Sequence, residues 1–263
     1  MVKSVDEPSS GQRTTGHVLR GGGASARVRP WPGSNNVAHL VTLDLRSGLH
    51  SAVLRSWLHQ LSALGYTHIR TGAIRPAQRG PYDALGFTPA QELALLQYDT
   101  RLTGTPRVPP HLPPTGVRIR RGRPSDAGLL AELDQQAFPS GWGLDAEGVL
   151  DAIRATPSSR IAVAVRQGDS ISDRMPLGYA VSGRGGRAAY LQRLAVTPEA
   201  RMIGIGALLV ADGLRWARRW RTHTVTVNTQ SDNTPALNLY QGCGYVLQPA
   251  RLVVMERSLD NIP

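Results

Sequence analysis

The sequence has a single cysteine, Cys243, and a single lysine, Lys3, among its 263 residues. One cysteine excludes an intramolecular disulfide and a cysteine-based zinc cluster, and it fits a reducing cytoplasm, which we expect as the compartment. No apolar run approaches the ~20 residues of a membrane-spanning helix, and the start of the chain lacks the apolar core of a signal peptide. We therefore expect no export, no membrane insertion and no metal site.

Because lysine is so rare, all but one of the 30 basic residues are arginines, and the formal net charge is +11. A guanidinium group grips phosphate and carboxylate groups with two donors at once, so the charge favours an acidic or phosphorylated partner. A GC-rich coding bias is the alternative cause of this composition. An arginine-rich nucleic-acid-binding protein is disfavoured, since the arginines are scattered and no helix-turn-helix or RNA-binding motif is present.

Composition divides the chain into four parts. Residues 1–36, rich in Ser, Gly, Pro and Arg, are predicted to be a disordered tail. Residues 37–102 predict a small α/β domain of strand, helix and strand. Residues 103–116 hold five prolines in fourteen residues and predict a stiff linker, and residues 117–263 predict a second, larger domain.

The second domain shows a strand, two helices and then three strands that we expect to form an antiparallel meander. A long helix, a strand, a short helix and two closing strands follow. We place the first six elements at residues 117–121, 124–138, 145–155, 160–166, 177–182 and 188–196. The long helix follows the turn that ends at about Gly204 and runs to about Arg219, and the last four elements are at residues 223–228, 235–241, 245–248 and 252–257.

The most informative segment is the turn between the third meander strand and the long helix. It reads Arg201-Met202-Ile203-Gly204-Ile205-Gly206, followed by Ala207. A helix N-terminus exposes unpaired N–H groups and partial positive charge, and residues without Cβ let an anion approach the backbone. The segment predicts a pyrophosphate site. Its glycine spacing matches neither a dinucleotide-binding fold nor a P-loop; two glycines there can also serve packing or capping.

Arg201, Gly204 and Gly206 match the R/Q-x-x-G-x-G/A motif by which the GCN5-related N-acetyltransferases bind acetyl-CoA. A second match is N-x-x-A-x-x-x-Y-x-x-x-G-F/Y, which starts at Asn233 and includes Tyr240. Residues 117–259 thus resemble this family, most of all its ribosomal-protein N-terminal-alanine acetyltransferases. The resemblance implies an α/β (α+β) fold with a mixed, mostly antiparallel central sheet flanked by helices.

The resemblance also implies the roles of individual residues. The pantetheine and acetyl end of acetyl-CoA would bind the backbone of Leu194, Ala195 and Val196, and Asn233 would contact the pantetheine arm. The pyrophosphate would bind the amides of Arg201, Met202, Ile203, Gly204, Ile205, Gly206 and Ala207. Tyr240 would protonate the departing CoA thiolate, for which a phenol is a suitable acid; without the motif, it reads as a packing residue.

The sequence departs from the family at the general base. Where the alanine-acetyltransferase branch has a glutamate, this chain has Asn228, and an amide cannot accept the proton of the amine. A water chain, an amine that is already neutral, or a carboxylate such as Asp134 or Asp232 remain as alternatives. His223 is a further titratable candidate that also reads as an ordinary strand residue.

The acceptor is expected between the first two helices and the closing hairpin, with an apolar slot of Phe138, Trp142 and Tyr190. Core packing is the alternative for Phe138. The arginines that end the long helix form either an anionic docking site or a solvated face that complements the helix dipole; they are Arg215, Arg218, Arg219 and Arg221.

The first domain contains an echo of the second, since residues 82–87 repeat the Tyr-x-x-x-Gly-aromatic pattern of residues 240–245. We therefore hypothesise a degenerate partial acetyltransferase domain that holds no CoA; coincidence in a short α/β segment is the alternative. A tandem arrangement is also similar to that of mycothiol synthases.

Together these features predict an acetyl-CoA-dependent N-acetyltransferase. Its acceptor would be a primary amine, either of a protein N-terminus or peptide or of a small molecule. A non-catalytic CoA-binding sensor or interaction module is the first alternative, because the base is missing.

Overall fold

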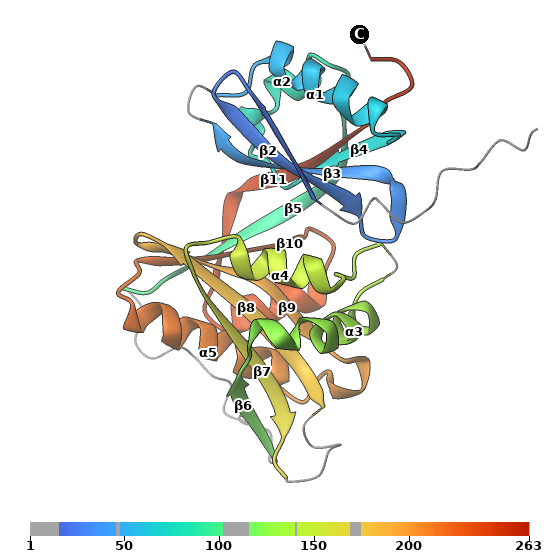
Figure 1. The fold of residues 1–263 in the computed structure, drawn as a ribbon. Helices are drawn as coiled ribbons and strands as arrows, with labels where there is room; N and C mark the ends of the chain where they lie inside the picture. Colours follow the sequence, from blue (N-terminus) through green and yellow to red (C-terminus); the bar gives the residue numbers. More distant parts are fainter. Residues whose placement is uncertain (1–15, 46–47, 102–115, 140, 169–174, 263) are drawn as a thin grey trace, which may run out of the picture. The chain divides into compact units, whose positions relative to one another are not determined.

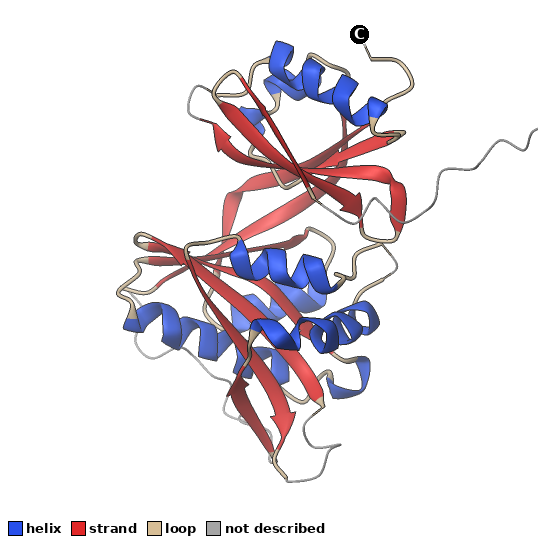
Figure 2. Ribbon diagram, viewed as in Figure 1, coloured by secondary structure: helices blue, strands red, loops and turns tan. Residues whose placement is uncertain are grey.

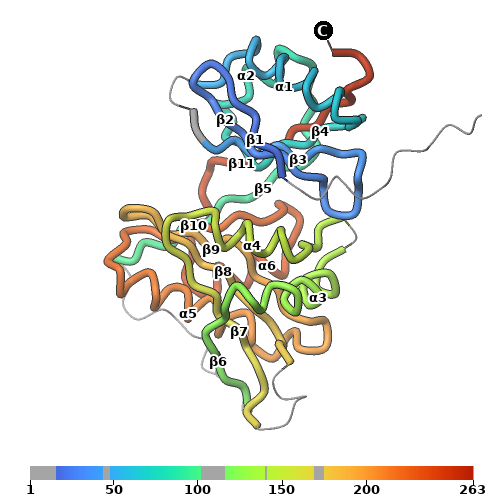
Figure 3. Tube along the Cα trace, viewed as in Figure 1, coloured from blue at the N-terminus to red at the C-terminus, as the bar shows by residue number. Residues whose placement is uncertain are grey.

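The computed structural model describes residues 16–45, 48–101, 116–139, 141–168 and 175–262. These residues fall into two compact units. The first unit contains the chain up to Glu92 and again from Leu252 onward, and the second unit contains Leu93–Arg251. The division shows that the C-terminal segment belongs with the N-terminal half of the chain, as the red trace among the blue elements illustrates (Figure 3).

The second unit has a six-stranded sheet in the order β5-β10-β9-β8-β7-β6. Helices lie on both sides of this sheet (Figures 1 and 2). Its elements are β6 (Val117–Arg121), α3 (Ala127–Ala137), α4 (Ala146–Arg154), β7 (Ser158–Arg166), β8 (Pro176–Gly185), β9 (Ala188–Val196), α5 (Ile205–Arg219), β10 (Thr224–Gln230) and α6 (Thr234–Gly242), with short 3-10 turns before α3 and α5. The predicted meander is confirmed, because β7, β8 and β9 pair antiparallel in sequence order.

Two apolar cores cover the two faces of this sheet. On one face, α3 and α4 pack over residues such as Val163, Tyr179 and Val181. On the other, α5 packs over residues such as Leu191 and Val225. Alternation of side chains along each strand explains the division, since neighbouring residues of a strand point to opposite faces.

The strand beside β10 comes from the first half of the chain. β5 (Thr88–Asp99) pairs antiparallel with β10, from Leu93 opposite Gln230 to Asp99 opposite Thr224. Its buried residues Leu96 and Tyr98 belong to the core under α5. The second unit is therefore completed by a strand that precedes the proline-rich segment.

The first unit contains the strands β1 (His17–Gly21), β2 (Ala24–Trp31), β3 (Ser34–Leu45) and β4 (His68–Thr71), the helices α1 (Ser51–Ala63) and α2 (Gly80–Asp83), and part of β11 (Val246–Ser258). Its sheet has the order β1-β2-β3-β4-β11. Glu256 of β11 pairs with Arg70 of β4 in the strand register and by an ion pair of 2.8 Å. Met255 is fully buried in the core of this unit.

The two halves of the chain repeat one another. In each, three strands form an antiparallel meander, and the third strand runs parallel to the next across a helix: β3-α1-β4 corresponds to β9-α5-β10. A further helix and a last strand follow, α2 and β5 or α6 and β11. Each half gives its last strand to the sheet of the other, since β5 pairs with β10 and β11 with β4. Between residues 16 and 92, the described chain has no counterpart of β6, α3 and α4.

The repeated Tyr-x-x-x-Gly-aromatic pattern has the same local structure in both halves. The amide of Phe87 donates to the carbonyl of Tyr82 (3.1 Å), and that of Tyr245 donates to the carbonyl of Tyr240 (3.0 Å). The glycine before each aromatic residue has positive φ. This bond closes the end of a helix and directs the chain into a strand. The first half is therefore a partial copy of the second, in agreement with the hypothesis of a degenerate domain.

Four sequence-based boundaries are wrong, one of them the end of the first domain at residue 102, since Leu93–Asp99 belongs to the second unit. Residues 17–36 form β1, β2 and the start of β3 rather than a tail, because the Gly22-Gly23 and Pro32-Gly33 pairs are two-residue hairpin turns between strands of alternating burial. The closing strands are one strand, β11, and residues 252–262 belong to the first unit, where their apolar side chains are buried. Residues 1–15 and 102–115 lie outside the described residues.

Candidate functional site

The strands β9 and β10 separate after a short parallel ladder. They pair only where Ala188, Ala189 and Tyr190 face Thr224, Val225 and Thr226, whereas β10 continues its pairing with β5 up to Gln230. Among the described residues, the β9 segment Leu191–Val196 therefore has no partner strand on its β10 side. The backbone of Leu194, Ala195 and Val196 thus lies along an opening in the sheet, where main-chain groups can bind a ligand.

A β-bulge marks the beginning of this opening. In the β8–β9 register, Val181 faces Arg193 and Ser182 faces Leu191, so that Gln192 is an extra residue on β9. A bulge changes the direction of the side chains around it. Arg193 reaches Asp134 of α3, and the side chain of Gln192 lies against Gly183, so both lie on the α3–α4 face. In the sequence, the signal for this bulge is the adjacent polar pair Gln192 and Arg193 in an otherwise apolar strand. The strand pattern alone does not predict the bulge.

The turn before α5 has the features of an anion cradle. Gly204 caps the helix with φ of 91°, a conformation that other residues rarely adopt. The first helical hydrogen bond runs from the amide of Leu208 to the carbonyl of Gly204 (3.0 Å). The amides of Ile205, Gly206 and Ala207 therefore precede the helical ladder and lie at the positive end of the helix dipole.

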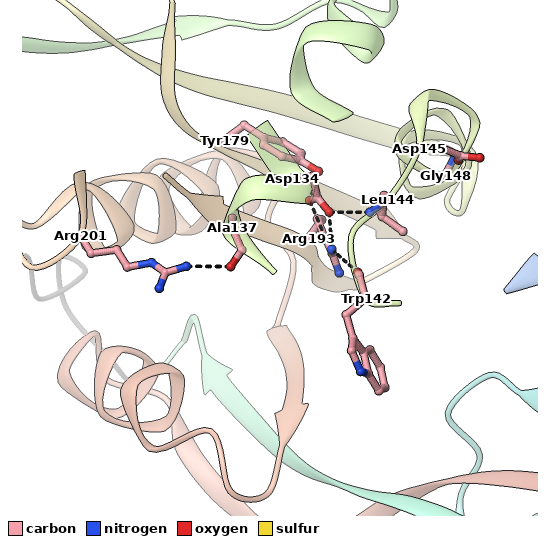
Figure 4. A network of polar contacts seen from close by, with 9 residues as sticks. All are labelled: Asp134, Ala137, Trp142, Leu144, Asp145, Gly148, Tyr179, Arg193 and Arg201. Atoms are coloured by element: carbon pink, nitrogen blue, oxygen red, sulfur yellow. Dashed lines mark hydrogen bonds and ion pairs between the residues drawn. The ribbon is translucent and has the colours of Figure 1, made fainter. Parts of the chain in front are cut away.

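The remaining residues of this turn differ in their surroundings. Met202, with φ of 61°, is 98% exposed, and Ile203 is about half exposed. The Arg201 guanidinium donates to the carbonyl of Ala137 at 2.7 Å, which ties the turn to the end of α3 (Figure 4). A Cβ on Gly206 would lie 3.1 Å from Leu239, so the missing side chain lets α6 pack closely on the first turn of α5. The alternative packing role of this glycine is thus visible in the structure.

The helix α6 carries both residues of the second motif. Asn233 caps it, its Oδ1 accepting a hydrogen bond from the amide of Ala236 (3.2 Å). Tyr240 is buried, and burial raises the pKa of its phenol well above the usual 10, against a lowering by the positive charge of Arg193. The phenol therefore stays protonated at neutral pH and is able to donate a proton.

Burial also raises the pKa of the Cys243 thiol to about 11, so the thiol is not a reactive nucleophile at neutral pH.

The candidate base Asp134 is fully buried and satisfied by donors (Figure 4). Its carboxylate accepts hydrogen bonds from the Tyr179 hydroxyl (2.6 Å), the Leu144 amide (2.7 Å) and the Arg193 Nε (2.8 Å), and Arg193 Nη2 binds its second oxygen. Both oxygens of this carboxylate thus accept hydrogen bonds inside the core, so its contacts are structural and do not support a role for Asp134 as the base.

The other candidates for the base lie at three separate positions. Asn228, at the position of the family glutamate, is exposed on β10. Asp232 is exposed in the turn before α6. His223 precedes β10 at its paired end, where its amide donates to the carbonyl of Arg187 (2.7 Å). The strands β9 and β10 themselves contain no carboxylate.

The same ion pair arranges the segment between α3 and α4. Arg193 also donates to the carbonyl of Trp142 (2.8 Å), and its guanidinium lies 3.7 Å from the centre of the Phe138 ring. The ring of Phe138 packs against the core under α3, the alternative role foreseen for it. The indole of Trp142 points away from the network (Figure 4), and Tyr190 is 41% exposed on β9. The contacts of Phe138 do not support its place in an acceptor slot.

The described residues contain no group of three or more His, Cys, Asp or Glu side chains that could hold a metal ion. None of the described helices is long and apolar enough to cross a membrane.

Comparisons with known proteins agree with this architecture. Residues 129–245 match the model of the acetyltransferase (GNAT) family. A 65-residue segment, 24% of the chain, is 37% identical to a mycothiol acetyltransferase of Arthrobacter sp. (strain FB24), of which the match covers only 20%.

Two solved structures share the fold over nearly the whole chain. A tandem GNAT protein from the clavulanic acid biosynthesis pathway has a TM-score of 0.62 at 16% identity, with 93% of this chain and 82% of that one covered. A GCN5-related N-acetyltransferase from Kribbella flavida has a TM-score of 0.60 at 14% identity, with 92% and 89% covered. With its family match over residues 129–245, its splayed strands and its repeated half, the chain has the fold of a tandem GNAT protein.

Proposed function

We propose that the chain is an acetyl-CoA-dependent N-acetyltransferase, whose acceptor is a primary amine of a protein N-terminus, a peptide or a small molecule. The observation that carries the proposal is the opening between β9 and β10, which ends at the amides of the first turn of α5. α6 packs on this turn through Leu239, the residue before Tyr240. A main-chain edge, an anion cradle and a buried phenol thus belong to adjoining elements.

The residues present fit acetyl-CoA. When bound, this cofactor supplies an activated thioester carbonyl and a thiolate leaving group. The amides of Ile205, Gly206 and Ala207 would hold its phosphates, and the free edge of Leu194–Val196 would bind its pantetheine arm and carbonyl oxygen by backbone hydrogen bonds. Tyr240 would provide the proton for the leaving sulfur; burial keeps its phenol protonated at neutral pH by raising its pKa, and at the same time makes it a weaker acid than a free tyrosine.

The lining of the opening favours an amine that arrives neutral. Thr226 and Asn228 lie on the face of β10 opposite the buried Val225 and Val227, so this face offers uncharged groups. With no carboxylate on β9 or β10 to take the proton, reactivity follows the neutral fraction of the amine. An α-amino group, with a pKa of about 7.7 to 8.0, is neutral far more often at pH 7.5 than a lysine side chain at about 10.4. We therefore propose α-amino groups or similarly weak bases as acceptors.

The test combines CoA binding with turnover on a panel of amines. We expect saturable binding of acetyl-CoA and amine-dependent release of CoA, and we expect Tyr240→Phe to lower kcat about 100-fold while the Kd for acetyl-CoA stays within about twofold. Tyr98→Phe is the matched control. Its hydroxyl is also buried but has no hydrogen-bond partner among the described residues, so its removal should leave kcat unchanged.

Each outcome of this test has a distinct meaning. Binding without turnover on any amine would favour the non-catalytic CoA sensor instead. Absence of CoA binding would refute both functions. Unchanged kcat in Tyr240→Phe would remove this residue from the role of the acid.

A further inference from the structure

A second candidate site lies in the second unit, at the other end of α5 from the anion cradle. There the end of β5, the end of α5 and the start of β10 enclose a surface cavity of about 270 Å³. Its lining residues are Thr100, Arg101, Arg218, Arg221, Thr222 and His223. Since α5 has 15 residues at about 1.5 Å each, roughly 20 Å separate the cavity from the cradle.

The lining has a large excess of positive charge. Three of the six residues are arginines, and none is acidic. The carboxylate of Asp99 binds Arg101 through Nη2 at 2.8 Å and through Nε at 3.1 Å. This ion pair offsets one of the three guanidinium charges of the lining.

The helix dipole does not account for this cluster. Cations in the last turn of a helix do complement the negative end of its dipole, which explains Arg218 and Arg219. Arg101, however, comes from the end of β5, and His223 precedes β10. Arginine and histidine side chains from three elements thus meet in one concave site.

Arg221 occupies a position where the backbone favours glycine. Its φ is 51°, and the amide of Thr222 donates to the carbonyl of Ala217 (3.3 Å), as at a helix end closed by a left-handed residue. A side chain in this conformation is unfavourable, and most helices that end in this way use glycine. An arginine here accepts backbone strain and places its guanidinium at the cavity.

The walls of the cavity are held by buried hydroxyl groups. Thr100 Oγ1 donates to the carbonyl of Thr222, and Thr222 Oγ1 donates to the carbonyl of Ala217 (3.1 Å). These bonds join β5, β10 and α5 around the arginines. The site is therefore fixed by the fold.

We propose that this cavity binds a phosphate group of a small molecule. Guanidinium groups bind phosphate oxygens with paired, charge-assisted hydrogen bonds. A volume of about 270 Å³ suits a phosphate or pyrophosphate group, whereas drug-sized ligands occupy cavities of about 300 to 1,000 Å³. A polynucleotide backbone carries the same group, but the arginines converge in a pocket rather than along an extended stripe. The proposal is independent of the acetyltransferase function.

The test is calorimetric titration of the full chain with inorganic phosphate and pyrophosphate at constant ionic strength in chloride. We expect Arg221→Gly to weaken binding at least about tenfold, since it removes a charged hydrogen-bond donor. The same variant should unfold at an equal or higher temperature, because glycine relieves the strain. Arg218→Gln provides a second variant with the same expected loss of binding. Arg219→Gln, on the same helix end but outside the cavity, should bind as the unchanged chain does.

Binding at the anion cradle is distinguished by Gly204→Ala, which alters the cradle alone. Phosphate binding that is lost in Gly204→Ala but retained in Arg221→Gly and Arg218→Gln would overturn the proposal. So would binding of a uniform-sequence DNA oligonucleotide when neither phosphate nor pyrophosphate binds. A failure of CoA to bind would leave this prediction unaffected, because the two sites share no residue.

Discussion

The buried ion pair between Asp134 and Arg193 allows a quantitative prediction. Asp134 is fully buried and accepts donors from Tyr179, Leu144 and Arg193, and the Arg193 side chain is only 16% exposed. Asp134→Asn keeps the size of the side chain but removes its charge and leaves the guanidinium facing an amide. Breaking a buried pair in this way costs about 3 to 5 kcal/mol.

This loss is a large part of the stability of an ordinary domain, which is about 5 to 15 kcal/mol. At about 2 to 4 °C per kcal/mol for a unit of this size, the melting temperature should fall by about 6 to 20 °C. Denaturant titration followed by circular dichroism measures the free energy of unfolding directly. Solvent screens this pair little, so the full range applies.

The matched control is an exposed pair. Glu147 and Arg154 of α4 lie 4.0 Å apart with side chains 59% and 62% exposed, so Glu147→Gln should change stability by less than about 1 kcal/mol. A double variant, Asp134→Leu with Arg193→Met, removes both charges and should be more stable than Asp134→Asn alone. A loss below about 1 kcal/mol in Asp134→Asn would refute the assigned role of the pair.

The pair also predicts a functional effect. Arg193 holds the carbonyl of Trp142, and Asp134 holds the amide of Leu144, so the segment between α3 and α4 depends on both. If this segment contacts the acceptor, Asp134→Asn should raise the KM for the amine and leave the Kd for acetyl-CoA within about twofold. Steady-state kinetics at a temperature where the variant is folded separates the two constants.

Three further predictions concern the cradle, the acid and the exchanged strand. Gly204→Ala places a Cβ at φ of 91°, so it should lower the free energy of unfolding by about 1 to 2 kcal/mol and weaken CoA binding. Denaturation measures the first effect and calorimetry the second. Wild-type values for both would contradict the assignment of this turn as an anion cradle. Because burial raises the pKa of Tyr240, kcat should rise with pH up to the pKa of the amine and then stay level through pH 10, and a fall below pH 9 would contradict this. A fragment of residues 116–263 lacks β5, whose Leu96 is fully buried, so it should not unfold cooperatively in a denaturant titration. A cooperative transition at wild-type stability would show that the second unit does not need β5.

The comparison of sequence and structure shows which features are local. The turn 201–207 and the motif from Asn233 to Tyr245 depend on residues within one helix end, where capping and glycine conformation determine the structure. The elements from β6 to α6 were predicted within a few residues for the same reason. The repeated helix end at residues 82–87 was also visible, since its hydrogen bonds span only six residues.

Other features depended on contacts between distant residues. The glycine-rich start of the chain predicts a tail by its turn residues, whereas the alternation of Ala24, Ala26 and Val28 is explained by the pairing of β2 with β1 and β3. Asp134 is a candidate base in the sequence, because nothing there shows that Arg193, 59 residues away, binds it. Both features depend on pairings that no short window of sequence contains.

The sequence by itself predicted the resemblance to the acetyltransferases, the glycine turn before α5 and the acid candidate, because each depends on residue types at short, fixed spacings. Only the tertiary structure decided that the halves exchange their last strands, that Asp134 is held in an ion pair, and that arginines of separate elements share one cavity. The physical reason is that strand pairing, burial of charge and convergence of side chains are long-range interactions, whose partners are chosen by the packing of the whole chain.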